Sequence, residues 1–224
     1  MFKYLKLFII ALAGIIAAFF ITVIFSNSNN NTTVLSLDKD LYTKLTQEKF
    51  SISIPDEKTT QSIITVKYRP LVWGIVEADF NDFKTKVKET LNDTRGWKRA
   101  GLQFIEVENG ADVDIILSDP ASLGATPGCS SELSCTTWSN QVIINDLRWR
   151  EGTEASRSAN MSTRDYQHMV INHEMGHWLG HHQHETSCPN GGPAPIMLQQ
   201  STGMRGCDSF NAWPLDWELW TNKK

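Results

Sequence analysis

Two histidines and one glutamate stand at a spacing that can hold and use a metal ion. In His173-Glu174-Met-Gly-His177, a helical backbone puts both imidazoles one turn apart on one face, where both reach one zinc ion. Glu174 follows the first histidine, so its carboxylate can take a proton from a zinc-bound water. Two core histidines with hydrogen-bonded neighbours are the alternative. Because zinc accounts for all three polar residues at once, we predict a zinc site with Glu174 as general base.

A helix ending at Gly180 must carry this motif. Ser162 with Asp165 three residues later is typical of a helix N-cap. Apolar residues at three- and four-residue steps lead into the two histidines, and others cover most of the remaining sides, which predicts a buried central helix. Gly180 permits the left-handed turn that ends it. His168 lies about 140° around this helix from His173, and we expect it not to be a ligand.

A catalytic zinc ion needs a third protein ligand and one position left open for water. The candidates after the helix are His181, His182, His184 and Glu185. A glutamate from a later helix, as in thermolysin-like sites, is disfavoured because no glutamate stands between Glu185 and Glu218. The residues alone leave the choice among the candidates open.

The motif resembles the signature of the metzincin metallopeptidases, His-Glu-x-x-His-x-x-Gly-x-x-His followed by a turn that contains Met. Four residues match its first part: His173, Glu174, His177 and Gly180. Met197, in Ala-Pro-Ile-Met, is similar to the Met-turn beneath the zinc. The third signature position falls on Gln183, and His184 stands one residue later. The resemblance therefore implies His184 as third ligand, with His182 and then His181 as alternatives.

A longer series of motifs resembles the DUF3152 family of bacterial exported proteins, over roughly residues 60 to 218. The matching segments are Cys129–Cys135, Val142–Trp149, Asn172–His181, Cys188-Pro189 and Pro193–Gln200. Some metzincins place a tyrosine just after the Met-turn, whereas Leu198, Gln199 and Gln200 follow it here. Either the zinc itself or one of these glutamines would then polarise the substrate carbonyl.

The remaining elements indicate an α+β fold with a mixed, mostly parallel sheet, two long helices and an irregular C-terminal part. The resemblance implies that this is a metzincin-like zincin domain. We expect a helix over 76–91 and strands over 63–68 (stopped by Pro70), 102–107, 113–117 and 141–145. Residues 119–140 read as a long functional or cross-linked loop. If strand 141–145 forms the sheet edge along the cleft, it could pair with an extended peptide.

Four cysteines suit an exported chain and allow three pairings. We predict that nearest neighbours pair, Cys129 with Cys135 and Cys188 with Cys207, closing two local loops. A structural zinc site is the alternative, but the chain has no Cys-x-x-Cys spacing.

The N-terminus carries an uncharged apolar run from Leu7 to Phe25. As a helix it would span roughly 28 Å, near the thickness of a bilayer core, and Lys3 and Lys6 before it place that end in the cytoplasm. We therefore predict a cytoplasmic tip and anchor over 1–27, a linker and extension over 28–59, and a metallopeptidase domain over 60–224. A cleaved signal peptide and secretion are the alternative.

A net charge of −4 and a pI near 5.9 offer no basic face for nucleic acid. The sequence thus predicts a membrane-anchored, extracytoplasmic zinc endopeptidase that acts on an unidentified peptide or protein. A peptidase-like module that only binds, and a domain whose zinc only holds the fold, are the alternatives.

Overall fold

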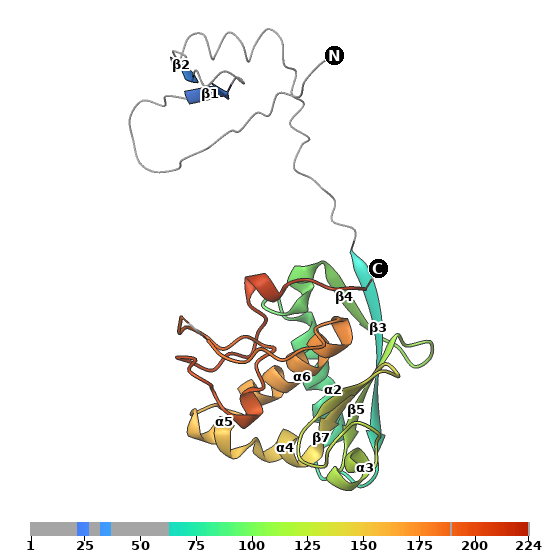
Figure 1. The fold of residues 1–224 in the computed structure, drawn as a ribbon. Helices are drawn as coiled ribbons and strands as arrows, with labels where there is room; N and C mark the ends of the chain where they lie inside the picture. The colour runs from blue at the N-terminus through green and yellow to red at the C-terminus, as the bar shows by residue number, and fades with distance from the viewer. Residues whose placement is uncertain (1–21, 27–31, 37–62, 189, 224) are drawn as a thin grey trace. The chain divides into compact units, whose positions relative to one another are not determined.

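The computed structural model describes residues 22–26, 32–36, 63–188 and 190–223 (Figure 1). The chain divides into two compact units, residues 1–60 and 61–224. In the first unit, strands β1 (Thr22–Ser26) and β2 (Thr32–Ser36) pair antiparallel.

Residues 7–21 of the predicted membrane helix lie outside the described residues. Most of the predicted linker, residues 28–59, lies outside them as well. The last residues of the predicted helix belong to strand β1, so the prediction of helix is wrong there; the β-branched run Thr-Val-Ile favours an extended backbone. Among the helices of the described ranges, none is long and apolar enough to cross a membrane.

The second unit is built on a five-stranded sheet with the order β4-β3-β5-β7-β6. Four strands are parallel, and the edge strand β6 is antiparallel to β7. The strands are β3 (Ile64–Trp73), β4 (Leu102–Glu106), β5 (Val113–Ser118), β6 (Cys135–Thr137) and β7 (Gln141–Asn145). The predicted mixed, mostly parallel sheet is confirmed.

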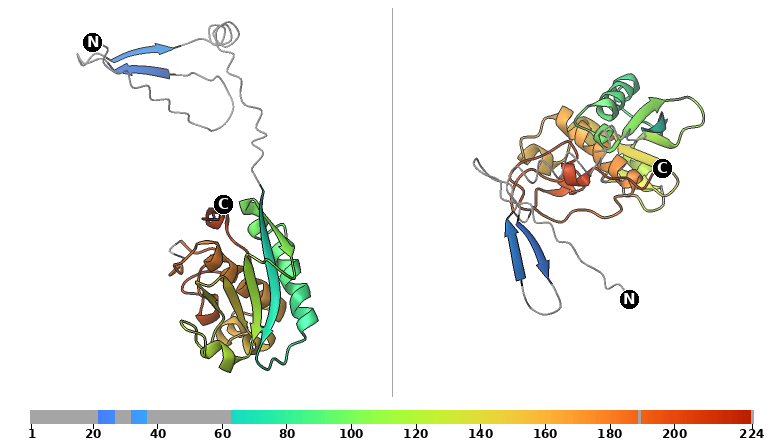
Figure 2. Two further views of the ribbon diagram at one scale, coloured as in Figure 1. Left: turned by 90° about the vertical axis from the view of Figure 1, so that its right-hand side faces the viewer. Right: turned by 90° about the horizontal axis from the view of Figure 1, so that it is seen from above.

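The alternation of side chains along each strand divides the core between the two faces of the sheet. Ile115 and Leu117 of β5 face the main core, which is formed with helices α2 (Phe80–Asn92) and α6 (Thr163–Leu179). Ile116, between them, joins a smaller cluster with Leu123 of the short helix α3 (Pro120–Gly124). The two long helices therefore pack on one face of the sheet (Figure 1; Figure 2).

Three boundaries differ from the sequence prediction. Strand β3 continues through Pro70 because its pairing with β4 ends at Tyr68, so beyond that point only β5 bonds to it and a missing N–H is tolerated. Helix α2 begins at Phe80, four residues late, because Asp79 is its N-cap and accepts from the Asp82 N–H. Strand β7 is not the sheet edge, because β6 pairs along its outer side.

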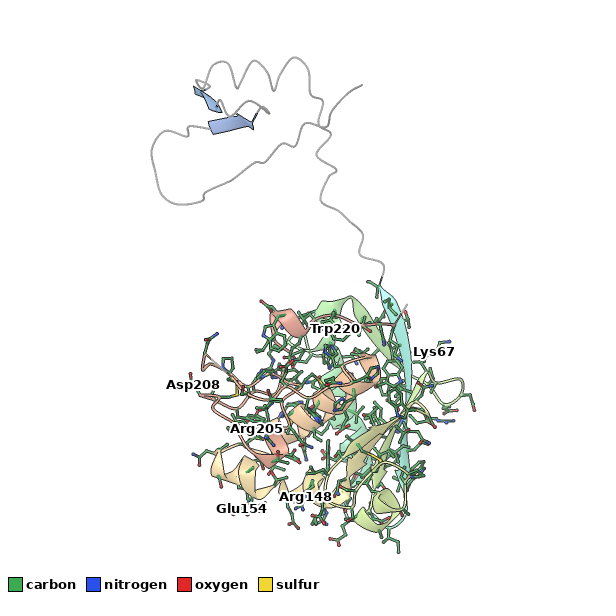
Figure 3. All side chains as sticks on the ribbon, in the orientation of Figure 1. Lys67, Arg148, Glu154, Arg205, Asp208 and Trp220 are labelled. Atoms are coloured by element: carbon green, nitrogen blue, oxygen red, sulfur yellow. A yellow bond between two sulfur atoms is a disulfide. The ribbon has the colours of Figure 1, made fainter. Side chains whose placement is uncertain are left out.

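Between β7 and α6 the chain forms two short helices, α4 (Asp146–Glu151) and α5 (Glu154–Ser158). Three 3-10 helices add single turns: η1 (Trp97–Ala100), η2 (Gln200–Thr202) and η3 (Asp216–Glu218). The C-terminal part is otherwise irregular, as predicted, and Figure 3 shows Arg205 and Asp208 within it. Both predicted disulfides are present, Cys129–Cys135 and Cys188–Cys207.

Helix α6 has the predicted start and end. The Ser162 side chain accepts from the Asp165 N–H, and its hydroxyl donates to the Asp165 carboxylate, which satisfies the first turn. Gly180, at φ 120°, ends the helix. Most of the residues between are buried, which confirms a central helix without a solvent face.

Candidate metal centre

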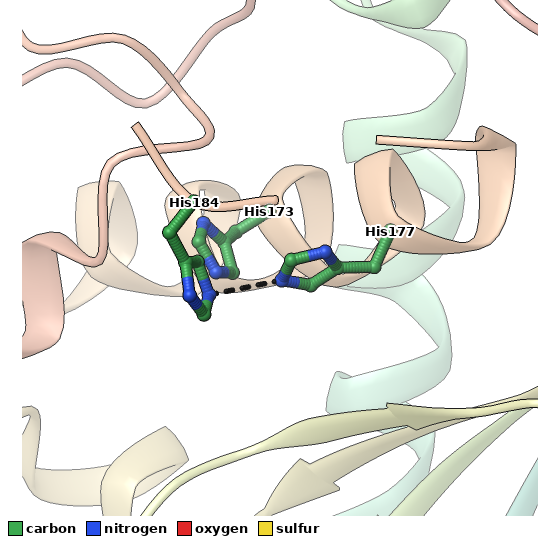
Figure 4. A group of neighbouring side chains, drawn as sticks. All are labelled: His173, His177 and His184. Atoms are coloured by element: carbon green, nitrogen blue, oxygen red, sulfur yellow. Dashed lines mark hydrogen bonds between the residues drawn. The ribbon is translucent and has the colours of Figure 1, made fainter. Parts of the chain in front are cut away.

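Three histidines from two elements meet at one point (Figure 4). His173 and His177 project from the same face of α6, and His184 comes from the loop that follows the helix. The Nε2 atoms of His177 and His184 are 3.1 Å apart, and one potential ligand atom from each of the three side chains lies within 4.8 Å of the others. This geometry could hold one metal ion.

Backbone carbonyls fix the orientation of the two helix imidazoles. The Nδ1–H of His173 donates to the Ile196 carbonyl at 2.7 Å, and the Nδ1–H of His177 donates to the His181 carbonyl at 2.6 Å. Each bond selects the tautomer whose Nε2 lone pair is free, which is the arrangement found behind metal-binding histidines.

The donor set fits zinc. Tetrahedral coordination at 2.0–2.1 Å separates ligand nitrogens by about 3.4 Å, so small side-chain rotations suffice to close the cluster. Burial lowers the pKa of His173 to about 3 and that of His177 to about 4, and the neighbouring imidazoles act in the same direction. Both rings are therefore neutral near pH 7, as a metal ligand must be.

The other candidates for third ligand point elsewhere. His181 donates through Nε2 to the Trp220 carbonyl, and the ring of His182 lies against Trp138 with centroids 5.2 Å apart. The N–H of Glu185 donates to the Met197 carbonyl, and its side chain is exposed. His168, expected to be no ligand, donates through Nδ1 to the Thr90 hydroxyl oxygen inside the core.

Glu174 is buried beside the cluster, and its carboxylate has one hydroxyl partner among the described residues. Thr136 of β6 donates to Glu174 Oε2 at 2.8 Å and lies 2.9 Å from the Glu174 backbone oxygen. Burial raises the pKa of Glu174 to about 7, and the bond from Thr136 opposes this rise. A carboxyl group poised near neutral pH is suited to both taking up and releasing a proton.

Replacing Thr136 by valine should lower the turnover of a peptide substrate about 10-fold, because a hydrogen bond to a charged group is lost without a change in side-chain shape. Zinc content should be unchanged, and Thr136→Ser, which restores the hydroxyl, should recover most of the rate. The comparison requires kcat and metal content for the three proteins. Equal kcat in all three would show that Thr136 does not orient Glu174.

Met197 packs against Gly176, the glycine within the motif. A Cβ atom added at Gly176 would come 2.4 Å from the Met197 sulfur and 3.0 Å from the Trp97 ring. Met197 is buried and therefore packs directly on the helix backbone between the two histidine ligands. A side chain at position 176 would displace the Met197 side chain, so glycine allows the close approach of Met197 to the helix.

Gln199 and Gln200, which follow Met197 closely, differ in how their side chains are held. Gln200 is buried and donates through Nε2 to the carbonyls of Pro195 and Asn211, so it acts as a packing residue. Gln199 lines the cleft and is the glutamine available to a bound substrate.

The cluster opens into a cleft of about 670 Å³. One wall is made by β6 and the loop before it, including the Cys129–Cys135 disulfide and the exposed ring of Trp138. β6 is the outermost strand of the sheet and its three residues line this cleft, so no other strand of the described fold pairs with its outer side.

Thr136 is the functional residue that sequence reasoning missed. It lies in a stretch rich in Ser, Gly and Cys, and a three-residue strand gives no periodic signal. The predicted disulfide between Cys129 and Cys135 is the sequence feature that indicates a fixed conformation for this stretch.

Comparison with known proteins adds one match. No curated protein matches the sequence. The family model described as "Protein of unknown function (DUF3152)" matches residues 39–219, which is most of the chain. The chain therefore belongs to the DUF3152 family.

Proposed function

We propose that this protein is a zinc-dependent endopeptidase of metzincin-like architecture. The observation that carries the proposal is the convergence of His173, His177 and His184 beside the buried carboxylate of Glu174 in one open cleft. Three histidines leave one coordination position of zinc for water or substrate, which is the ligand count of a catalytic rather than a structural site.

The side chains around the cluster divide the work of hydrolysis. Zinc, when bound, would lower the pKa of a water molecule and polarise the peptide carbonyl. Glu174 takes the proton of the attacking water and then delivers it to the leaving amine, while Thr136 holds its carboxylate. The two backbone carbonyls keep His173 and His177 in place, and Met197 packs on the helix at Gly176 between them.

The free edge of β6 supports a peptide as substrate. An extended peptide can add to a sheet edge through its main chain, and β6 lies along the cleft next to Glu174. Strand 141–145 would have offered this pairing if it formed the sheet edge; because β6 is the outer strand, we propose the pairing on β6. Trp138 at the end of β6 then offers an apolar contact to one substrate side chain.

Two disulfides support action outside the cytoplasm, because such bonds persist in oxidising compartments. On the basis of the N-terminal sequence, we propose a membrane anchor in the apolar run that begins at Leu7, behind Lys3 and Lys6, with the catalytic unit outside the cell.

A module that only binds, or a domain with purely structural zinc, would have no use for a buried glutamate next to the ligands. Burial of an ionisable carboxyl group without a cationic partner costs stability, and the open cleft above it gives that cost a catalytic role. We therefore favour the peptidase over both alternatives.

Zinc content is the direct test. The protein expressed in an oxidising compartment should carry about one zinc ion per chain, as expected for a single three-histidine site. His184→Ala should lose it, whereas His182→Ala, a change two residues away in the same exposed loop, should keep it. Zinc retained by His184→Ala would assign the third ligand elsewhere, and a folded wild type without zinc would refute the proposal.

A further inference from the structure

Glu218, near the C-terminus, is fully buried although it is a carboxylic acid. Its hydrogen bonds within the described part of the chain all come from backbone N–H groups. Ile196 and Leu215 donate to Oε2 at 2.9 and 2.8 Å, and Met197 donates to Oε1 at 2.9 Å. A buried carboxylate held by three amides is an expensive arrangement that packing alone would not require.

The hydrogen bonds around Glu218 favour its ionised form. Burial raises the pKa of Glu218 above its ordinary value, and the three N–H donors oppose this rise. Three N–H donors directed at the two oxygens stabilise a negative charge on them, because hydrogen bonds to the charged form of a carboxyl group favour that form. The geometry of three donors around two oxygens therefore favours a carboxylate.

One peptide group connects this carboxylate to the candidate metal centre. The N–H of Met197 and the C=O of Ile196 belong to the same planar trans peptide unit and point in opposite directions. Glu218 accepts from the N–H end, and His173 donates through Nδ1–H to the carbonyl end at 2.7 Å. Two hydrogen bonds therefore link the Glu218 carboxylate, the 196–197 peptide group and the His173 imidazole, in that order.

A negative charge at the N–H end polarises the peptide group, which makes its carbonyl oxygen a stronger acceptor. A stronger bond to Nδ1–H fixes the ring and increases the electron density at Nε2, as a carboxylate does when it bonds directly to a metal-binding histidine. The peptide group thus transmits to His173 the effect that a direct carboxylate partner would have.

The same C-terminal segment supports the second helix histidine. His181 donates to the Trp220 carbonyl, and its ring lies 3.8 Å from the Trp220 ring by centroids. The His181 carbonyl in turn accepts from Nδ1–H of His177. Two residues of one segment, two positions apart, therefore stand behind two different histidines.

We infer that Glu218 is a positioning residue for the metal centre, acting on His173 through the peptide group between Ile196 and Met197. This inference rests on the proposed zinc site and adds a residue to it that lies 45 positions after His173 in the sequence. Its consequence is that zinc affinity depends on the charge of a side chain that touches no ligand.

The test is zinc affinity, measured by competition with a chromophoric chelator, for the full chain and for Glu218→Gln. Glutamine keeps the size of the side chain but removes the charge and one acceptor. Zinc should dissociate about 10-fold more readily, the lower end of the effect known for direct partners of metal ligands. Wild-type affinity in a folded Glu218→Gln protein would overturn the inference.

Asn211→Ala is the matched control. Asn211 also ties the C-terminal part together, through Nδ2 to the carbonyls of Ala194 and Trp213, but it makes no bond to the 196–197 peptide group. Its variant should unfold at a lower temperature and yet bind zinc like the wild type. An equal loss of zinc affinity in both variants would reduce Glu218 to a general structural role and overturn the inference.

Glu218→Asp covers the case in which the glutamine variant does not fold. Aspartate keeps the charge, but it is one methylene too short to bond the Ile196 and Met197 N–H groups together, so it should also weaken zinc binding. Unchanged affinity would overturn the inference while leaving the proposed peptidase intact. A wild type that binds no zinc would refute the proposed function and this inference with it.

Discussion

Glu174→Gln should reduce peptide hydrolysis by about 10²- to 10⁴-fold in kcat, the range expected when a general base is removed. The amide cannot take a proton from water, although it has the same shape and can still accept from Thr136. The three histidines are unaltered, so zinc content should remain at the wild-type value. The effect is therefore expected on turnover alone.

The measurement is the initial rate of cleavage of a mixed peptide library, followed by mass spectrometry, together with metal analysis of each sample. Glu185→Gln is the matched control: it makes the same chemical change on an exposed side chain of the loop beside the site, and should leave the rate unchanged. Undiminished cleavage by Glu174→Gln would exclude Glu174 as the base.

In the metal-free protein, His173 and Glu174 should have opposite effects on the free energy of unfolding when the pH is lowered. Because the pKa of His173 is about 3, below its ordinary 6.5, the unfolded chain binds more protons, and acidification from pH 8 to 5 lowers the free energy of unfolding by about 2 kcal/mol. Glu174 has the opposite effect, because its pKa is about 7 instead of 4.5 and the folded chain therefore binds more protons at this residue. Over the same pH interval it raises the free energy of unfolding by about 2 kcal/mol. The lowered pKa of His177 acts like that of His173 and lowers the free energy of unfolding further on acidification.

Metal-free Glu174→Gln should therefore be more sensitive to acid than the wild type, by about 2 kcal/mol at pH 5 relative to pH 8. Urea denaturation of both proteins in the presence of a chelator, at these two pH values, measures the difference. Glu185→Gln should follow the wild type. Parallel loss of stability in the wild type and Glu174→Gln would mean that Glu174 is ionised in the folded protein down to its ordinary pKa.

The parts of the fold that could be predicted are those with a strong local signal. The N-cap at Ser162, the apolar face leading into His173 and the stop at Gly180 are each encoded within a few residues, and helix α6 follows from them. The strands of the sheet centre, such as β5 and β7, are apolar runs with turn residues on either side. Pairing of the cysteines with their nearest neighbours follows from the short loops that it closes.

The parts that could not be predicted depend on contacts between distant segments. Asp146 accepts from the N–H groups of Glu77 and Ala78, which holds the chain before α2 outside the helix that its apolar pattern suggested. Strand β6 exists because β7 lies beside it, and its three residues carry no pattern of their own. Glu218 looks like one more surface acid in the sequence, since nothing local says that three backbone amides surround it.

Within the candidate site, the histidine pair and Glu174 could be found from spacing alone. The preference for His184 over His181 and His182 came from a family signature that this chain does not match at the third position. The structure brings His184 to the pair because the chain leaves α6 at Gly180 and turns back over it, a path that spacing along the sequence does not describe.

Helix α6 has protein on every side: thirteen of its seventeen residues are buried. Substitutions at buried positions usually destabilise, so this helix has almost no position where mutation is neutral. Exposed positions on the border of the cleft, such as Trp138 and His182, are under no such restriction. Evolution, or an engineer, is therefore free to change what the cleft recognises at those positions, while the helix that carries His173, Glu174 and His177 is inherited unchanged.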